Sequence, residues 1–309
     1  MRRSLYLTGL ALLTILFASE ANAQRWRSYK AEVYFGMGAS LYHGDLGGSS
    51  VEDGAAGPLF SDFHFDGTRP AFMFAYKYRF ADRYAVRTNL SMNFIAGHDA
   101  YAGNEGRFNR NLNFKGFVSE LSVQGEYYFL KENIGSRYGS RGVGGSGLDQ
   151  LAGYLFAGVG VGFFSSKGEI MDANGEMTGE WVKLRELNTE GQGLPGGPSS
   201  YSPITAVIPL GIGLKYSLNP QLTIGAEYGF RFTTTDYLDD ASGPNYYNND
   251  LILENYGETA ALMADKRTGN ARFSSNGTRG NNEINDHYQA AFIYMSYRIR
   301  TIYRGRSRF

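Results

Sequence analysis

The fold of this chain is decided by one stretch, YAVRTNLSMNFI, which runs from Tyr84 to Ile95. Residues such as Val86 and Leu90 alternate in it with polar residues such as Arg87 and Asn89. A period of two is the signature of a β-strand, in which successive side chains point to opposite faces. One face of this strand suits lipid and the other suits water. The stretch therefore predicts a strand of a sheet with one apolar and one polar side.

The same alternation recurs along the chain. It is as regular from Leu222 to Thr234, and six further segments show it, namely 32–41, 71–80, 117–129, 155–163, 204–215 and 288–300. Each is about 9 to 13 residues long, which is what a tilted strand needs to cross the hydrocarbon. Since an open sheet edge in lipid would leave backbone groups unpaired, the sheet must close. We therefore predict an all-β fold, a closed antiparallel transmembrane β-barrel of eight strands.

The connections support this architecture, because outer-membrane barrels alternate long external loops with short periplasmic turns. The tight turns are 81–83 and 219–221. With both termini in the periplasm, the long connections all face outward, and they are 43–69, 97–113, 166–202 and 235–287. The linker 131–150 breaks the pattern, because it places a Gly/Arg-rich stretch of roughly twenty residues on the periplasmic side.

Two outer loops are expected to be structured. Asn174-Gly175, between Ile170-Met171 and Trp181-Val182, predicts a small hairpin in the third loop. Leu251 to Lys266 predicts a short helix in the fourth. A ten-stranded barrel that uses the hairpin is the alternative that the sequence leaves open.

The N-terminal residues predict export. Arg2 and Arg3 precede an apolar stretch from Leu5 to Phe17, and Ala21-Asn22-Ala23 then offers the small residues that a signal peptidase requires. We expect a signal peptide at 1–23 and a barrel domain at 24–309. The chain has no cysteine, and no later run of about twenty apolar residues follows. The expected location is the cell outer membrane.

An eight-stranded barrel has an interior only wide enough for side chains, so the lumen should be filled. Its predicted charged lining consists of Glu32, Glu120, Glu126 and Glu227 with Lys77, Arg79, Arg87, Lys215, Arg231 and Arg298. A mixed set of charges can pair across the interior, whereas buried charges of one sign would be prohibitive. We interpret it as a structural ion network. Pro209 has no amide donor for the ladder, so we expect a bulge there.

The two ends of the barrel differ in charge. The fourth outer loop is acidic, and the periplasmic side gathers basic residues, of which the candidate partner contacts are Lys131, Arg137, Arg141, Arg304, Arg306 and Arg308. Such a rim could dock a periplasmic protein or be attracted to anionic membrane lipid. The net charge is zero, which gives no support for a nucleic-acid partner.

Little in the sequence points to catalysis. The four histidines, His43, His64, His98 and His287, fall in or beside outer loops, and no spacing ties any of them to a nucleophile. The segment Asp236 to Asp240 lacks the ligand spacing of a calcium loop, so we interpret it as a strand exit. We expect no catalytic residue, no cofactor and no metal site.

Four phrases at strand ends carry a resemblance to a known family. They are Tyr42-His43-Gly44-Asp45-Leu46, Arg110-Asn111-Leu112-Asn113-Phe114, Thr189-Glu190-Gly191-Gln192-Gly193 and Thr235-Asp236-Tyr237-Leu238-Asp239-Asp240. In this order they resemble the PorG-type outer-membrane barrels of Bacteroidota, a component of the type IX secretion system. The resemblance implies a non-enzymatic barrel that contacts periplasmic secretion-ring proteins, a lipoprotein and its partner. The alternatives are a surface binder or adhesin that works through its outer loops, and a hydrolase that uses a loop histidine.

Overall fold

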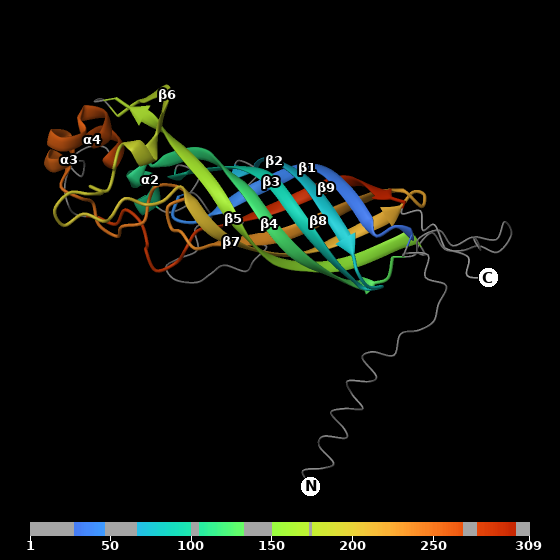
Figure 1. Ribbon diagram of the computed structural model, residues 1–309. Helices are drawn as coiled ribbons and strands as arrows, with labels where there is room; N and C mark the ends of the chain where they lie inside the picture. Colours follow the sequence, from blue (N-terminus) through green and yellow to red (C-terminus); the bar gives the residue numbers. More distant parts are fainter. Residues whose placement is uncertain are drawn as a thin grey trace, which may run out of the picture.

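A computed structural model of the chain describes residues 28–46, 67–99, 105–132, 150–172, 175–267 and 277–300. Its main body is a barrel of antiparallel strands (Figure 1). The barrel strands are β1 (Ala31–His43), β2 (Arg69–Arg79), β3 (Tyr84–His98), β4 (Asn113–Leu130), β5 (Leu151–Met171), β7 (Ile204–Ser217), β8 (Leu222–Thr233) and β9 (His287–Ile299). Each of the eight predicted segments corresponds to one of them, which confirms the predicted strands.

The sheet closes between its first and last strands. β1 pairs with β9 along its whole length, from Ala31 opposite Ile299 to His43 opposite His287. The remaining barrel strands pair in chain order, with β5 next to β7. Closure leaves no edge of the barrel unpaired, as a sheet that spans a membrane requires.

The ninth strand, β6 (Met177–Lys183), is not part of the barrel wall. Among the described strands it pairs with β5 alone, from Met171 opposite Met177 to Lys167 opposite Lys183. It is the second arm of the hairpin predicted in the third outer loop. The eight-stranded prediction is therefore confirmed, and the ten-stranded alternative is wrong.

The two faces of the barrel have the predicted polarity. On β3, exposed and buried residues alternate from Tyr84 to Asn93. The outer face exposes apolar side chains such as Val159 and Ile293, 69% and 73% exposed, whereas Arg87 is fully buried inside. An apolar belt around a polar interior is the reverse of a soluble barrel, and it matches a hydrocarbon surrounding. The chain is thus an outer-membrane β-barrel.

Pro209 causes no bulge, so that expectation was wrong. The β5–β7 ladder keeps one register across it, with Ala157 opposite Leu210 and Gly160 opposite Val207, and only the pairs between them are missing. On its other side Pro209 pairs with Arg231 in register. The chain therefore tolerates the missing amide as a gap in one ladder. The register of the barrel shifts elsewhere, between Tyr128 and Leu130.

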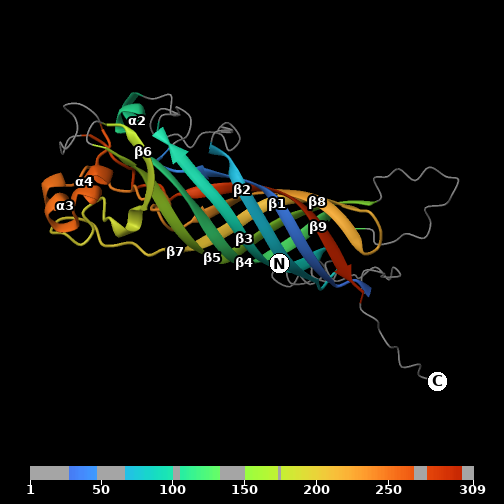
Figure 2. The ribbon, with the colours of Figure 1, turned by 90° about the horizontal axis from the view of Figure 1, so that it is seen from above.

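Short helices and β6 gather at the outer end of the barrel (Figures 1 and 2). They are α2 (Glu105–Arg110), the 3-10 turn η5 (Leu184–Glu186), α3 (Asn249–Tyr256) and α4 (Glu258–Ala264). The single helix predicted for 251–266 is divided at Gly257, whose φ of 86° an α-helix does not accept. No helix in the described ranges has the length and hydropathy to span a membrane.

Several predictions fall outside the described residues. They include the signal peptide at 1–23 and the central part, 133–149, of the basic linker.

Candidate functional site

The charged lining of the lumen is the first candidate site. All ten predicted residues are buried, none more than 3% exposed. They pair across the barrel: Glu32 lies 2.5 Å from the Lys77 ammonium and 2.9 Å from that of Lys215. Glu227 binds Arg87 at 2.6 Å. The predicted ion network is confirmed, and its pairing offsets the cost of burying these charges.

Tyrosine hydroxyls connect the ion pairs to one another. Tyr128 donates to Glu126 at 2.8 Å and accepts from Lys77 at 2.7 Å. Tyr154 donates to Glu227 at 2.9 Å and lies 3.0 Å from the Tyr294 hydroxyl. These tyrosines also pack in one core cluster with alanines and Phe292. Side chains therefore fill the middle of the lumen.

Glu132, which sequence reasoning placed in the linker, seals the periplasmic end of the lumen. Its carboxylate lies 2.9 Å from Arg79 and 2.6 Å from Lys215, and it also binds Arg298. Burial raises the pKa of Glu132, but the attraction of Lys215, Lys77 and Arg298 outweighs it, and the pKa lies below its usual range. The inward series of β4 is interrupted at Leu130, which is 40% exposed, so the alternation alone does not predict this position of Glu132.

The candidate partner contacts lie at or beyond the same end. Lys131 is at the rim, partly exposed, with its ammonium 3.1 Å from Asp82 in the tight turn after β2. The other five, Arg137, Arg141, Arg304, Arg306 and Arg308, lie outside the described residues. Arg298, near the same end of the chain, points into the lumen as predicted and is 1% exposed. It is a structural cation of the lumen.

The outer loops form a compact cap, which is the second candidate site. The four phrases that carry the family resemblance, at 42–46, 110–114, 189–193 and 235–240, meet in it. Their contacts are Leu46 N to Asp239 at 3.0 Å, Arg110 to the Asp45 carbonyl at 2.6 Å, and Thr189 to Asp240 at 2.6 Å. Apolar side chains from the same loops form a core over the barrel mouth. The expectation of structured outer loops is confirmed.

Much of the acidity of the fourth outer loop is used inside the cap. Five of its nine acids are buried, namely Asp236, Asp239, Asp240, Asp265 and Asp286. Asp240, for example, accepts hydrogen bonds from the hydroxyls of Thr189 and Tyr201, each at 2.6 Å. Burial raises the pKa of Asp240 to about 6. The loop therefore presents less negative charge to the outside than its sequence indicates.

One tyrosine hydroxyl joins two of these carboxyls. Tyr42 Oη lies 2.7 Å from Asp239 Oδ2 and 2.6 Å from Asp286 Oδ1. A hydroxyl has one hydrogen to donate, so the second short contact requires a proton on a carboxyl group. Burial, followed by neighbouring carboxylates, raises the pKa of both Asp239 and Asp286 well above the usual range. The three residues thus share an extra proton that fixes the cap to β1.

These contacts also bear on the alternatives involving a metal or catalysis. Asp236 to Asp240 lies after β8 as a strand exit, and Asp239 and Asp240 accept hydrogen bonds from protein donors. The rings of His43 and His287 stack with centroids 5.1 Å apart. His64 lies outside the described residues. Within the described ranges no group of three or more potential ligands could hold a metal ion.

No protein-family model matches the chain, and no curated protein is significantly similar to it. Solved structures of other outer-membrane proteins match it weakly. Neisserial surface protein A is 8% identical over 87% of this chain and 97% of its own, with a TM-score of 0.37. Ail, the attachment invasion locus protein of Yersinia pestis, is 10% identical over 88% of this chain and 99% of its own, with a TM-score of 0.37. A major outer membrane protein from Thermus thermophilus is 13% identical over 87% of this chain and 99% of its own, also with a TM-score of 0.37. At this level of similarity, the strand pairing of the chain itself establishes the barrel.

Proposed function

We propose that this chain is a non-enzymatic barrel of the type IX protein secretion machinery that anchors or positions a periplasmic ring complex at the outer membrane. The observation that carries the proposal is the filled lumen. Ion pairs and tyrosines occupy it, and Glu132 with its three cations seals its periplasmic end. A barrel filled in this way is unsuited to conduction, so its activity belongs to its surfaces.

The periplasmic surface supports the anchoring role. Lys131 is partly exposed at this end, and the sequence on its C-terminal side adds Arg137 and Arg141. Lys131 lies 3.1 Å from Asp82 and is still partly exposed, so it can also meet an external partner. A basic rim attracts an acidic protein surface and orients its approach. The resemblance to PorG-type barrels supplies the identity of the partner, a secretion-ring lipoprotein and its companion.

A second candidate function is surface binding through the cap. The observation in its favour is that α3, although packed on the cap through Ile252, exposes Leu251 and Leu253 to the outside. Apolar side chains that are exposed on a rigid support are suited to contact another protein.

The test is an affinity pull-down of the tagged full chain from detergent-solubilised outer membranes. The variant is Arg137→Glu/Arg141→Glu, and the matched control is Lys183→Glu/Arg185→Glu, which makes the same change of charge at the outer end. Recovery of ring proteins by parent and control, but not by the variant, is the expected result.

Two other outcomes would contradict the proposal. Equal recovery by the variant would remove the basic linker from the docking surface. If the parent recovers no ring component under mild extraction, the anchoring role fails. In that case Leu251→Ser/Leu253→Ser, assayed for binding at the cell surface, becomes the test of the second candidate.

A further inference from the structure

Three lysines lie on one rung of the sheet at the outer end of the barrel. Lys115 of β4 is directly opposite Lys167 of β5, which is directly opposite Lys183 of β6. We call these three residues the lysine rung. Like charges in directly opposed positions destabilise a sheet. In the described part of the chain only Lys183 of the three forms an ion pair, with the exposed Glu186 at 2.8 Å. The rung therefore keeps a net positive charge, since one carboxylate faces three ammonium groups.

The lysine rung faces outward, on the side of the barrel that meets lipid. All three lysines are exposed, and Lys115 lies 3.6 Å above the ring of Trp181, which is on the same face of β6. Tryptophan and lysine together are typical of the level at which a membrane protein meets the lipid headgroups.

A row of aromatic rings lies just below the lysine rung. Phe94, Phe117 and Phe163 are outward-facing residues of β3, β4 and β5, with centroids 6.5 and 6.2 Å apart between neighbours. Phe117 is two residues from Lys115 along β4, a distance of about 6.6 Å along a strand. Below this aromatic row the outer face continues with Val161 and Leu121. The ammonium groups thus lie one short step above the apolar belt.

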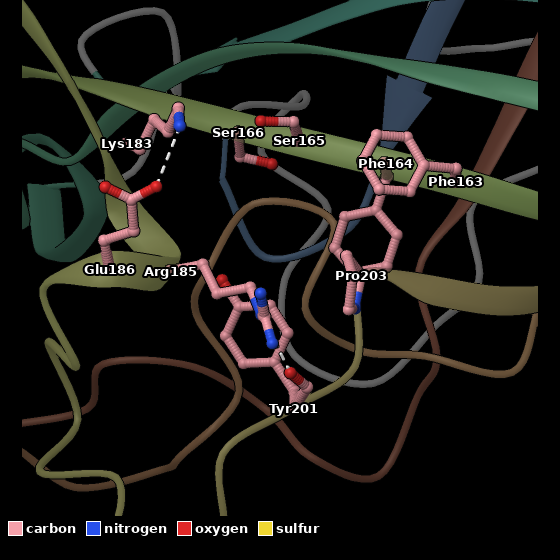
Figure 3. Close-up of a pocket in the computed structure, with 9 residues that line it drawn as sticks. All are labelled: Phe163, Phe164, Ser165, Ser166, Lys183, Arg185, Glu186, Tyr201 and Pro203. Atoms are coloured by element: carbon pink, nitrogen blue, oxygen red, sulfur yellow. Dashed lines mark hydrogen bonds and ion pairs between the residues drawn. The ribbon is translucent and has the colours of Figure 1, made fainter.

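The wall of the barrel has a notch between these two levels. The pairing of β5 with β7 ends at Phe163 opposite Ile204, and its pairing with β6 begins at Lys167. A cavity of about 150 Å³ occupies the interval (Figure 3). Its lining runs from Phe163 and Pro203 at the apolar end, past the hydroxyls of Ser165 and Ser166, to Lys183 and Arg185.

The inner side of the notch is closed. Tyr201 stacks on Phe164, at 6.1 Å between centroids, and on Tyr237 at 4.4 Å. Its carbonyl accepts a hydrogen bond from Arg185 Nε at 3.0 Å, which holds this arginine at the edge of the cavity. These rings separate the cavity from the lumen, and its lining includes Phe163, which is exposed on the outer face of the barrel.

We propose that this face of the barrel binds a lipid of the outer leaflet whose headgroup carries a phosphate group. The phosphate lies among the lysine rung and Arg185, and an acyl chain lies along the aromatic row into the notch. A phosphate offers three charged oxygens and so can be shared by several ammonium groups, which relieves their mutual repulsion. The occupant is a lipid because the cationic site is continuous with the apolar belt, and the cavity has room for only a short piece of chain.

The binding test uses Trp181 as its reporter. The chain has two tryptophans, so Trp26→Phe leaves Trp181 as the only one. This protein, in detergent micelles, is titrated with phosphatidic acid or phosphatidylcholine brominated on the acyl chains, because bromine quenches tryptophan at short range. Brominated phosphatidic acid should quench the fluorescence of Trp181 at a much lower mole fraction than brominated phosphatidylcholine does. Each lysine near an anionic lipid surface strengthens binding about fivefold. To reach the same quenching as the parent, Lys167→Gln/Lys183→Gln should therefore need about 30-fold more brominated phosphatidic acid. Lys30→Gln/Arg300→Gln, which makes the same change of charge at the periplasmic end, is the control and should behave as the parent.

Stability provides a second measurement, which does not depend on quenching. In phosphatidylcholine, Lys167→Gln removes repulsion from the rung, so its unfolding midpoint should equal or exceed that of the parent. With phosphatidic acid the order should reverse, because the parent gains more from the lipid. Equal quenching by both lipids in the parent, or a midpoint order that does not depend on the lipid, would overturn the proposal. Glycerol phosphate has no acyl chain. If it displaced brominated phosphatidic acid as well as unlabelled phosphatidic acid does, that result would also overturn the proposal.

Discussion

Replacing Glu132 tests whether the seal at the periplasmic end stabilises the barrel. Glu132→Gln keeps the shape of the side chain and removes its charge. Arg79, Lys215 and Arg298 are each at most 1% exposed, and they would lose a carboxylate that lies 2.6 to 2.9 Å from the first two. The amide NH₂ of glutamine is a donor and cannot replace the second carboxylate oxygen. The three buried cations would then share one carbonyl oxygen at this position, and of the three only Lys215 would keep a carboxylate from the described part of the chain within 3 Å, that of Glu32.

The expected cost follows from the burial of these partners. Removing one member of a buried ion pair destabilises a protein by about 3 to 5 kcal/mol. With a denaturant slope of about 3 kcal/mol per molar, the urea midpoint should fall by about 1 to 2 M. The assay is urea unfolding of the full chain in lipid vesicles, followed by the different gel migration of folded and unfolded barrel. Asp82→Asn is the control, because Asp82 is 45% exposed and its pairs with Arg79 and Lys131 should contribute less than about 1 kcal/mol.

The dependence on pH provides a further check of the same residue. Because the pKa of Glu132 is lowered in the folded state, its stabilising effect is present above the usual glutamate range and is lost as the pH falls toward the folded value. The difference between parent and variant should therefore be the same at pH 7 and pH 6 and shrink in strong acid. A Glu132→Gln midpoint within about 0.3 M of the parent, about 1 kcal/mol at that slope, would refute the reasoning.

The remaining predictions concern the cap and the closure of the barrel. Raised carboxyl pKa values mean that the cap loses stability as pH rises, which hydrogen exchange can measure. Asp286→Asn should weaken this dependence, because its amide can donate to the shared tyrosine hydroxyl and no longer titrates. Asp239→Asn should instead cost about 1 to 3 kcal/mol, since both carboxylate oxygens accept backbone N–H groups. Gly38→Ala should prevent refolding into the heat-modifiable barrel, because the new Cβ would overlap the Ala291 carbonyl, whereas Gly125→Ala, with 3.9 Å of room, should refold normally.

Features set by a period of two could be predicted from the sequence. Each strand and each predicted lumen charge follows from which side of a strand a residue occupies, and this needs no knowledge of distant contacts. Glu132 was missed because the strand ends before it, and because the register shift at Leu130, which is exposed, interrupts the inward series of Glu126 and Tyr128. Pro209 was misjudged because a gap in one ladder can replace a bulge.

The cap could be predicted only in outline, because its contacts join loops that are far apart in the sequence. Asp239 binds Tyr42 and Leu46 across nearly two hundred residues of chain, and no local pattern contains that pairing. The division of the predicted helix depends on the conformation of a single glycine, Gly257. The lysine rung could not be predicted either, because it too depends on contacts between distant segments. Its members belong to three strands, and only the register brings them side by side.

The charge balance of the lumen has a consequence for both proposals. Glu132 and the four predicted glutamates give five buried acids against six buried bases, a surplus of one positive charge. Asp82, 3.6 Å from Arg79, offsets that surplus at the periplasmic mouth. A lumen that is neutral over its length transmits little electrostatic influence from one end to the other, because opposite charges in contact cancel at a distance. The basic linker and the lysine rung are then independent sites at opposite ends. A charge reversal at one should leave the other unchanged, so the failure of either proposal would not weaken the other.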